Sequence, residues 1–168
     1  YPSKEQEVLI NKTLGCARFI YNQMLAERIA VYENLKEDKR ALYEHKYKTE
    51  KQYKEEFDFL KEVDSIAIQQ SRMNLSMAYQ NFFKSLSGKR KGKSGFPRFK
   101  KKKSGESYTT SMVNGNIAIN FETQEVKLPK IGKVKFRDER TSFAGKIKSA
   151  TVSRTPTGKY FVSLLFEQ

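Results

Sequence analysis

The chain has 168 residues, 38% of them hydrophobic, so it can supply the core of one domain or two small ones and is not disordered throughout. Its formal net charge of +14 favours a polyanionic partner, with nucleic acid ahead of an anionic membrane. No apolar run approaches the roughly 18 residues of a membrane-spanning helix, no signal peptide precedes the first helix, and the single cysteine excludes an internal disulfide framework, so we expect a cytoplasmic protein.

The first half of the chain is expected to be helical. Ser3 and Gln6 form a capping-box pattern, in which each side chain satisfies an orphan backbone donor at the start of a helix. Apolar residues then recur at helical spacing as far as about residue 32. The face that they form holds Ile10, Leu14, Ala17, Tyr21 and Met24. A polar turn over 33–40 and a highly charged helical region over about 41–56 are expected to follow.

A third helix is expected to begin at Asp64 or Ser65, either of which can cap it, and to stop before Gly88. Its apolar stripe holds Ile68, Ser71, Leu75, Ala78, Phe82 and Leu86. The opposite face is polar and free of acids, and includes Ser65, Gln69, Arg72 and Asn74. That face suits contact with a nucleic acid, although an ordinary solvated face explains it equally well.

The end of this helix lies in a window that is rich in positive charge. Residues 65–105 contain 11 Lys or Arg and no Asp or Glu, whereas residues 1–64 carry a net charge of −1. The window ends in the dense cluster Lys89–Lys103, which surrounds Phe96 and Phe99. Phosphate neutralisation requires such a cluster, and the alternative is a solubilising linker or a localisation signal. Because a linker has no use for aromatic rings, we favour nucleic-acid binding.

The second half changes to the two-residue period of strands. Asn114-Gly115 is a strong hairpin signal and is expected to join strands over 107–113 and 116–120. Further strands are expected over 125–129, 132–137, 146–154 and 160–167, the last two joined by the turn Thr155–Gly158. Strands of this size and spacing predict a small antiparallel β-barrel, in an α+β chain whose helices form a separate bundle and whose basic loop lies at the junction.

No catalytic constellation stands out. His45, the single histidine, lies in a charged helical region and is expected to be solvated, and Cys16 is expected to be a small core residue. One cysteine and one histidine cannot assemble a zinc site of the usual ligand count. The carboxylates show no isolated pair for a two-metal site, and residues 88–95 lack the spacing of a phosphate-binding loop. Alone, the chain is expected to bind rather than cleave.

Six segments together carry a resemblance to a known family: YPSKEQ (1–6), LGCARFIYNQML (14–25), AYQNFFK (78–84), GFPRFKKKKSGESYTT (95–110), LPKIGKVKF (128–136) and TVSRTPTGKYFVSLLFE (151–167). In order and spacing they resemble the N-terminal half of TnpB, a family of transposon-encoded RNA-guided DNA endonucleases that is ancestral to the type V CRISPR effectors. The resemblance covers essentially the whole chain, and its most specific element is Gly95–Phe99.

The resemblance implies an organisation in two parts. In the family, a β-barrel wedge domain is interrupted after its first strand by a helical recognition domain. Here the recognition domain would cover residues 1–88, and the basic loop and wedge barrel residues 89–168. A barrel strand would precede Tyr1, and a RuvC-like nuclease domain and a zinc ribbon would follow Gln168. Without them we expect no cleavage by this chain and no cofactor in it, since Mg²⁺ and Zn²⁺ would belong to that C-terminal half.

The resemblance also implies two sets of contact residues. The set for guide RNA, in which cations would neutralise phosphates, is Lys89, Arg90, Lys91, Lys93, Phe96, Arg98, Phe99, Lys100, Lys101, Lys102, Lys103 and Tyr108. Phe96 or Phe99 would either stack on a base or, as we favour, anchor the loop to the barrel. The set for double-stranded DNA at a short target-adjacent motif is Tyr43, Ser65, Ile66, Gln69, Arg72, Val113 and Asn114. Amide and apolar side chains suit adenine edges and thymine methyl groups.

Three functions therefore remain open. The leading one is the RNA- and DNA-binding lobe of an RNA-guided nuclease. Such a lobe would also contact its own nuclease half, and no membrane partner is expected. In such enzymes base pairing with the guide supplies most of the sequence specificity. The second is a stand-alone nucleic-acid-binding regulator, such as a repressor, that uses the same lobe. The third, a ribosomal-type RNA-binding protein, explains the charge and the barrel but leaves the order of the motifs unexplained.

Overall fold

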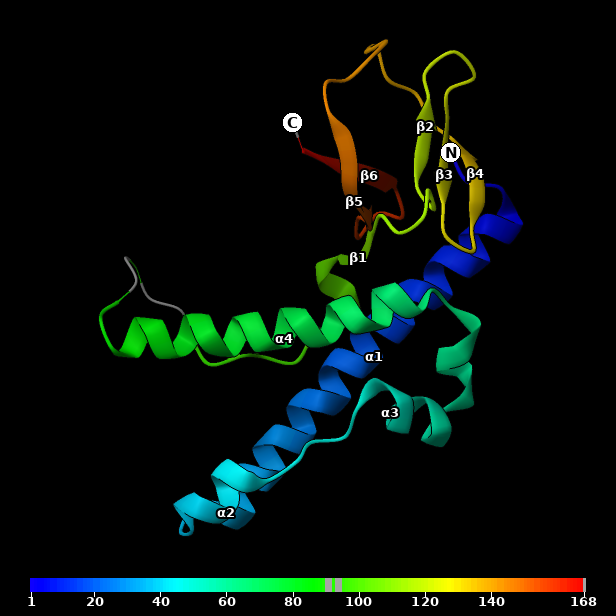
Figure 1. The fold of residues 1–168 in the computed structure, drawn as a ribbon. Coiled ribbons are helices and arrows are strands. Elements are labelled where there is room, and N and C mark those ends of the chain that lie inside the picture. The colour runs from blue at the N-terminus through cyan, green and yellow to red at the C-terminus, as the bar shows by residue number, and fades with distance from the viewer. Residues whose placement is uncertain (90–91, 93–94, 168) are drawn as a thin grey trace.

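The structure, a computed structural model, describes residues 1–89, 92 and 95–167. Helices come first along the chain and strands second (Figure 1), which confirms the predicted α+β class. The helices are α1 (Lys4–Leu35), α2 (Lys39–Glu44), α3 (Glu50–Glu56), the 3-10 helix η1 (Asp58–Glu62), α4 (Ser65–Leu86) and the 3-10 turn η2 (Lys102–Ser104). The strands are β1 (Glu106–Ser111), β2 (Ala118–Asn120), β3 (Glu125–Leu128), β4 (Gly132–Lys135), β5 (Lys146–Arg154) and β6 (Tyr160–Glu167).

Helix α1 begins at the capping box that the sequence predicts. The Ser3 hydroxyl accepts a hydrogen bond from the Gln6 N–H at 3.2 Å, and the Gln6 side-chain oxygen accepts one from the Ser3 N–H at 2.9 Å. These bonds satisfy two backbone donors that a helix start leaves without partners. All five residues of the predicted apolar face are buried. The helix ends at Leu35, slightly beyond the predicted end near residue 32.

The charged helical region predicted over 41–56 is divided into two short helices. Asp38 caps α2 through a hydrogen bond from the Ala41 N–H, and α2 ends at Glu44. Thr49 then starts α3 with a second capping box, completed by Gln52. Because an N-cap residue has non-helical dihedral angles, a strong cap at Thr49 interrupts the run of helix-forming residues.

Helix α4 has the predicted bounds. The Asp64 carboxylate caps its start, and Gly88, with φ of +73°, follows its end in the left-handed conformation that favours glycine. The predicted apolar stripe is buried only in the first half of the helix, at Ile68, Ser71 and Leu75. Farther on, α4 extends away from α1 (Figure 1), and Leu86 is exposed. The outer half of α4 is therefore available for contacts outside the core.

The strands form two antiparallel three-stranded sheets, in the orders β1-β5-β6 and β2-β3-β4. The predicted barrel is not found, because no pairing among the described residues closes these sheets on themselves. Residues 1–6 lie against β4, an edge strand of the second sheet. The amino group of Tyr1 donates to the Lys135 carbonyl at 2.6 Å, and the Gln6 side-chain amide donates to the Lys133 carbonyl at 2.7 Å, both on β4.

The Asn114-Gly115 turn forms, but it does not join a hairpin. Both residues have positive φ, +51° and +70°, as the predicted turn type requires. However, β1 pairs with β5, from Glu106 opposite Arg154 to Ser111 opposite Ser149, and β2 pairs with β3. The predicted pairing of 107–113 with 116–120 was therefore wrong, since a tight turn fixes where the chain reverses and leaves the choice of partner to side-chain burial.

Two clusters of buried side chains form the core. One lies within the helices and includes Ile20, Leu25, Tyr53, Leu60, Ile68 and Leu75. The other combines Ile10, Leu14 and Ala17 of α1 and Ala67 of α4 with residues of both sheets, among them Tyr108, Val126, Val134, Ala150 and Val152. We call this second group the shared core, because it crosses the predicted domain boundary between residues 88 and 89.

Candidate nucleic-acid interface

The basic segment, which we define as residues 95–104, leads from α4 back to α1 and on to β1 (Figure 1). Its midpoint is fixed to α1 by one side-chain amide. The Asn22 oxygen accepts from the Lys100 N–H at 2.8 Å, and the Asn22 nitrogen donates to the Lys100 carbonyl at 3.0 Å. The Lys100 ammonium nitrogen also lies 4.5 Å from the centroid of the Tyr21 ring. The basic segment thus lies at the junction of the helices and the strands, as predicted.

Phe96 anchors the basic segment, but to a helix and not to the sheets. Its ring meets the rings of Tyr79 and Phe82 on α4 edge-on, with centroids 5.4 Å away in each case, and neighbouring Pro97 is buried. The predicted anchoring partner, the barrel, was therefore wrong. Phe99 is 49% exposed and has no ring partner among the described residues, so its face is available for stacking.

Replacing Phe96 with alanine is expected to release the basic segment. Each aromatic pair contributes about 0.5–1.5 kcal/mol beyond its buried area, and Phe96 makes two. We expect the amide of Lys100, which is hydrogen-bonded to Asn22, to exchange its hydrogen about tenfold faster in the variant. Hydrogen exchange followed by NMR measures this rate. Phe99→Ala is the matched control, and equal acceleration in both variants would contradict the anchoring role.

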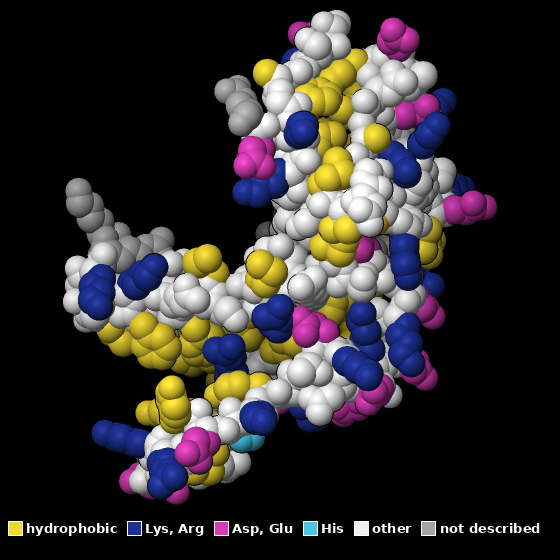
Figure 2. All heavy atoms as spheres, in the orientation of Figure 1, with side chains coloured by type: hydrophobic (Ala, Val, Ile, Leu, Met, Phe, Trp, Pro, Cys, Tyr) yellow, Lys and Arg dark blue, Asp and Glu magenta, His cyan; other side chains and the backbone are white. Residues whose placement is uncertain are grey.

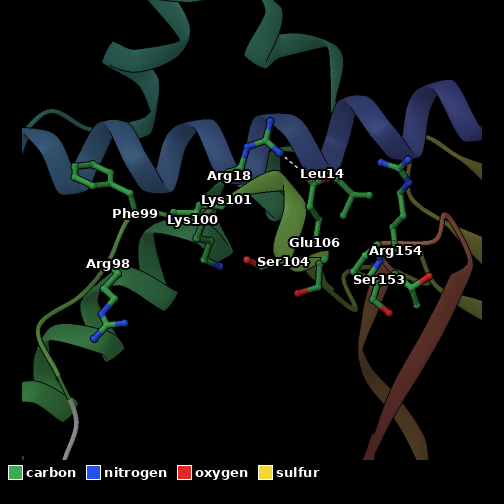
Figure 3. A pocket seen from close by; sticks show the side chains of 14 residues that line it. Leu14, Arg18, Arg98, Phe99, Lys100, Lys101, Ser104, Glu106, Ser153 and Arg154 are labelled. Carbon is green, nitrogen blue, oxygen red and sulfur yellow. Dashed lines mark hydrogen bonds and ion pairs between the residues drawn. The ribbon is translucent and has the colours of Figure 1, made fainter.

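A pocket of about 750 Å³ opens where the basic segment meets α1 and the adjoining ends of β1 and β5 (Figure 3). Its lining contains one carboxylate, Glu106, which forms an ion pair with Arg18 of α1. The cations that line it are Arg18, Arg98, Lys100, Lys101 and Arg154. Arg18 and Arg154 were not predicted as site residues, because neither lies in the basic cluster and the pairing of β1 with β5 was not foreseen.

The remaining predicted RNA contacts fall into three groups. Lys89, Lys102 and Lys103 are exposed, and the last two line a smaller pocket beside the first. Arg90, Lys91 and Lys93 lie outside the described residues. Tyr108 is only 4% exposed in the shared core, and burial, with Asp64 nearby, raises the pKa of its hydroxyl. A buried ring cannot contact RNA at the surface, so we withdraw Tyr108 from the interface.

Most of the residues predicted to face the DNA motif lie on two segments that one buried carboxylate brings together. Asp64 accepts a hydrogen bond from the Ile66 N–H at 3.0 Å and a second one from the hydroxyl of Thr110, which is fully buried on β1. This connects the start of α4, with Ser65, Ile66 and Gln69, to the end of β1. The chain continues from β1 to Val113 and Asn114, which are exposed.

Two residues of that set have other surroundings. Tyr43 is 91% exposed on α2, which lies at the end of α1 away from the sheets (Figure 1). It therefore does not lie near the start of α4. Arg72 forms an ion pair with Glu50 of α3, which offsets the charge that it could offer to a phosphate. Sequence spacing could not show either arrangement, because both depend on how α2 and α3 pack.

The face of the molecule in Figure 2 carries apolar side chains along the outer half of α4, with Lys and Arg side chains over helices and sheets alike. The exposed apolar residues of this part of the chain include Phe83, Leu86 and Phe96. Exposed rings beside cations are the combination with which proteins hold unpaired nucleotides.

Nothing in the described part of the chain has the chemistry of a metal site. It contains no group of three or more His, Cys, Asp or Glu side chains that could hold an ion. Cys16 is buried, and burial raises the pKa of its thiol to about 11, as suits an inert core residue. His45 is exposed. No helix of the described residues is long and apolar enough to span a bilayer.

Comparison with known proteins identifies the family. Over 99% of its length the chain is 32% identical to a Streptomyces pristinaespiralis protein assigned by name as an RNA-guided DNA endonuclease. It is 30% identical over 99% of its length to InsQ of Escherichia coli K12, which carries the same description. Residues 1–37 match the family model of a helix-turn-helix domain. The chain belongs to the TnpB family. It corresponds to an N-terminal part of TnpB and spans about two fifths of these relatives, 40% and 38% of their lengths.

A third relative of this TnpB chain is much shorter than the other two. VsdF, a virulence protein of Salmonella dublin, is 34% identical over 109 residues, which make up 61% of this chain and 87% of VsdF.

The helix-turn-helix description does not correspond to such a motif in this TnpB structure. Residues 4–35 form one uninterrupted helix, α1, and its buried residues belong to both core clusters. The residues that the family model matches thus hold one long helix and no second, recognition helix.

Proposed function

We propose that this chain binds guide RNA through the basic segment and the adjacent pocket, and double-stranded DNA at a short target-adjacent motif through the start of α4. It would act as the non-catalytic N-terminal lobe of an RNA-guided DNA endonuclease, with cleavage belonging to a nuclease half elsewhere in an intact protein. Support comes from membership of the TnpB family and from the names of the two longer relatives.

One observation carries the RNA-binding part of this proposal. Within the described residues, no Lys or Arg between Lys84 and Lys103 forms an ion pair, whereas cations of the helical half such as Lys12, Lys48 and Arg72 do. The unpaired cations include Arg98 and Lys100–Lys103 of the basic segment, and no acid occurs anywhere between residues 65 and 105. Cations without acidic partners are ready to neutralise phosphates and release the bound counterions.

A fluorescence-anisotropy titration at two salt concentrations tests the RNA-binding part. The probes are a structured RNA transcribed from the sequence that flanks the gene and a scrambled RNA of equal length. We expect the flanking RNA to bind more tightly at both salt concentrations. Equal and steeply salt-dependent binding of both probes would reduce the proposal to non-specific electrostatic attraction. Absence of binding to both probes would overturn it.

The DNA-binding part predicts a specific effect of Gln69, which is exposed on the second turn of α4. A glutamine amide can bond an adenine edge bidentately, and such a pair discriminates against wrong bases by about 1–3 kcal/mol. We expect Gln69→Ala to remove the preference at one position of the motif that the RNA-bound chain selects from randomised duplex DNA. Sequencing of the selected DNA measures this. Gln80→Ala, on the outer half of α4, is the control, and an unchanged motif in Gln69→Ala would exclude base reading by Gln69.

A second candidate function, a stand-alone regulator that binds DNA without a guide, is favoured by one observation. Most of VsdF, 87% of its length, is similar to this chain. A related sequence therefore also occurs in a protein that is much shorter than the two relatives named as RNA-guided endonucleases. The same selection carried out without RNA distinguishes the two functions. A motif selected equally well in the absence of RNA would favour the regulator.

A further inference from the structure

The side chain of Arg154, the last residue of β5, contains a hydrogen-bond donor, Nε, that has no acceptor among the described residues. This side chain points from the sheet toward α1 at the pocket (Figure 3). The Nε atom is buried and makes no hydrogen bond within the described part of the chain, and no ion pair of the described residues includes Arg154. Buried polar atoms are nearly always satisfied, so such a donor calls for a partner.

Glu106, the expected partner of Arg154, forms an ion pair with another residue. Glu106 lies directly opposite Arg154 in the register of β1 and β5, where a cross-strand ion pair would normally form. Its side chain is largely buried and instead forms an ion pair with Arg18 on α1. As Glu106 is the only carboxylate in the lining of the pocket, Arg154 is left facing a space that contains further cations and no second acid.

The rest of the pocket offers donors of the kind that hold an oxyanion. Arg98 and Lys101 come from the basic segment, and hydroxyl groups come from Ser104, Ser107 and Ser153. Arginine presents parallel N–H groups in a planar fork that matches two oxygens of a phosphate. The composition of this lining therefore suits a group with several acceptor oxygens and negative charge, and does not suit a neutral or cationic ligand.

We propose that this pocket holds one phosphate of the RNA backbone, with the guanidinium of Arg154 as its bidentate ligand. The inference rests on the proposed RNA binding and goes beyond it, because it names the atom group that is bound and a ligand outside the basic cluster. The RNA backbone is the favoured source of the phosphate, since the pocket continues directly from the exposed cations of the basic segment. A phosphate here would bridge α1 and the β1-β5-β6 sheet.

Three variants test the proposal by anisotropy with a fluorescein-labelled RNA hairpin that has a single-stranded tail. Arg154→Gln is expected to weaken binding about five- to tenfold at 0.1 M salt and to lower the log–log salt slope by about 0.7–0.9, as for one lost phosphate contact. Arg154→Lys keeps the charge and loses the fork, so it is expected to weaken binding several-fold with the slope unchanged. Arg137→Gln, at an exposed arginine beyond β4, is the control for charge.

Two results of the titration would contradict the proposal. Unchanged affinity and slope in Arg154→Gln overturn the proposal. An Arg154→Lys variant that binds like the original chain overturns the bidentate site and leaves diffuse charge. Both Arg154 variants are expected to keep the original unfolding midpoint, because Nε has no partner to lose. A lowered midpoint would make Arg154 structural and overturn its role as a ligand.

A second measurement separates failure of this proposal from failure of RNA binding in general. In ¹⁵N-labelled protein, the Nε–H resonance of Arg154 is assigned by its loss in Arg154→Lys and then followed on addition of inorganic phosphate alone and of the RNA hairpin. A shift with RNA that phosphate reproduces only at high concentration supports the backbone phosphate. A shift with phosphate and none with RNA shows an anion site without RNA binding, and no shift with either overturns the site itself.

Discussion

Leu14→Ala is expected to lower the free energy of unfolding by about 2–5 kcal/mol and to loosen the helices and the sheets together. Leu14 is 1% exposed on α1 and belongs to the shared core, so the methyl groups that it loses contact side chains from both halves of the chain. A cavity at this position removes packing from the only cluster of the described residues that joins α1 to both sheets.

Urea denaturation followed by two signals measures the effect of Leu14→Ala. Far-UV circular dichroism reports mainly on the helices, and tyrosine absorbance reports on both halves, because tyrosines occur in α1, α3 and β1. The two transitions are expected to coincide at a lowered midpoint. Val8→Ala, a truncation at an exposed position of the same helix, is the control and should shift stability by less than about 0.5 kcal/mol. A helical transition that stays in place would show that residues 1–88 fold independently.

Simultaneous replacement of Lys100–Lys103 with alanine is expected to have the largest effect on binding. Each phosphate contact that is lost lowers the log–log salt slope by about 0.7–0.9, so four contacts would lower it by about 3 and weaken RNA binding roughly 10³-fold at 0.1 M salt. None of these four side chains has an ion-pair partner among the described residues, and all four are exposed. The fold is therefore expected to survive the change.

The control for Lys100–Lys103 removes the same charge from a region where acids balance the cations. Suitable positions are exposed lysines of the helical half that form no ion pair in the described structure: Lys4, Lys39, Lys46 and Lys51. Their joint replacement by alanine is expected to change RNA affinity much less. If both quadruple variants lose affinity and slope equally, overall charge and not the basic segment attracts the RNA.

The parts of the fold that local chemistry determines could be predicted from the sequence. The capping box at Ser3, the cap at Asp64 and the positive φ of Gly88 and Gly158 follow from residue types that have few other uses. Strands β5 and β6 were predicted with their observed bounds. A long two-residue alternation of side chains between clear turns leaves little freedom in where a strand begins and ends.

The parts that depend on distant partners could not be predicted. Nothing in residues 106–111 indicates that β1 pairs with β5 and not with its neighbour in sequence. That pairing buries Tyr108 and places Arg154 at the pocket. Because the pairing was not predicted, Tyr108 was wrongly assigned as an RNA contact and Arg154 was overlooked. The position of Tyr43 could not be predicted for a similar reason, since it depends on α2 lying at the far end of α1 (Figure 1).

The shared core also constrains how the chain can fold as it is synthesised. Ile10 and Leu14 leave the ribosome before Ala150 and Val152, which belong to the same buried cluster and follow more than a hundred residues later. At translation rates of roughly 5–20 residues per second, this delay amounts to about 7–28 s. During that time the apolar face of α1 has only its helical neighbours to cover it. A nascent chain with this topology is expected to engage chaperones until β5 emerges, which makes the last strands the step that commits the whole lobe to its native state.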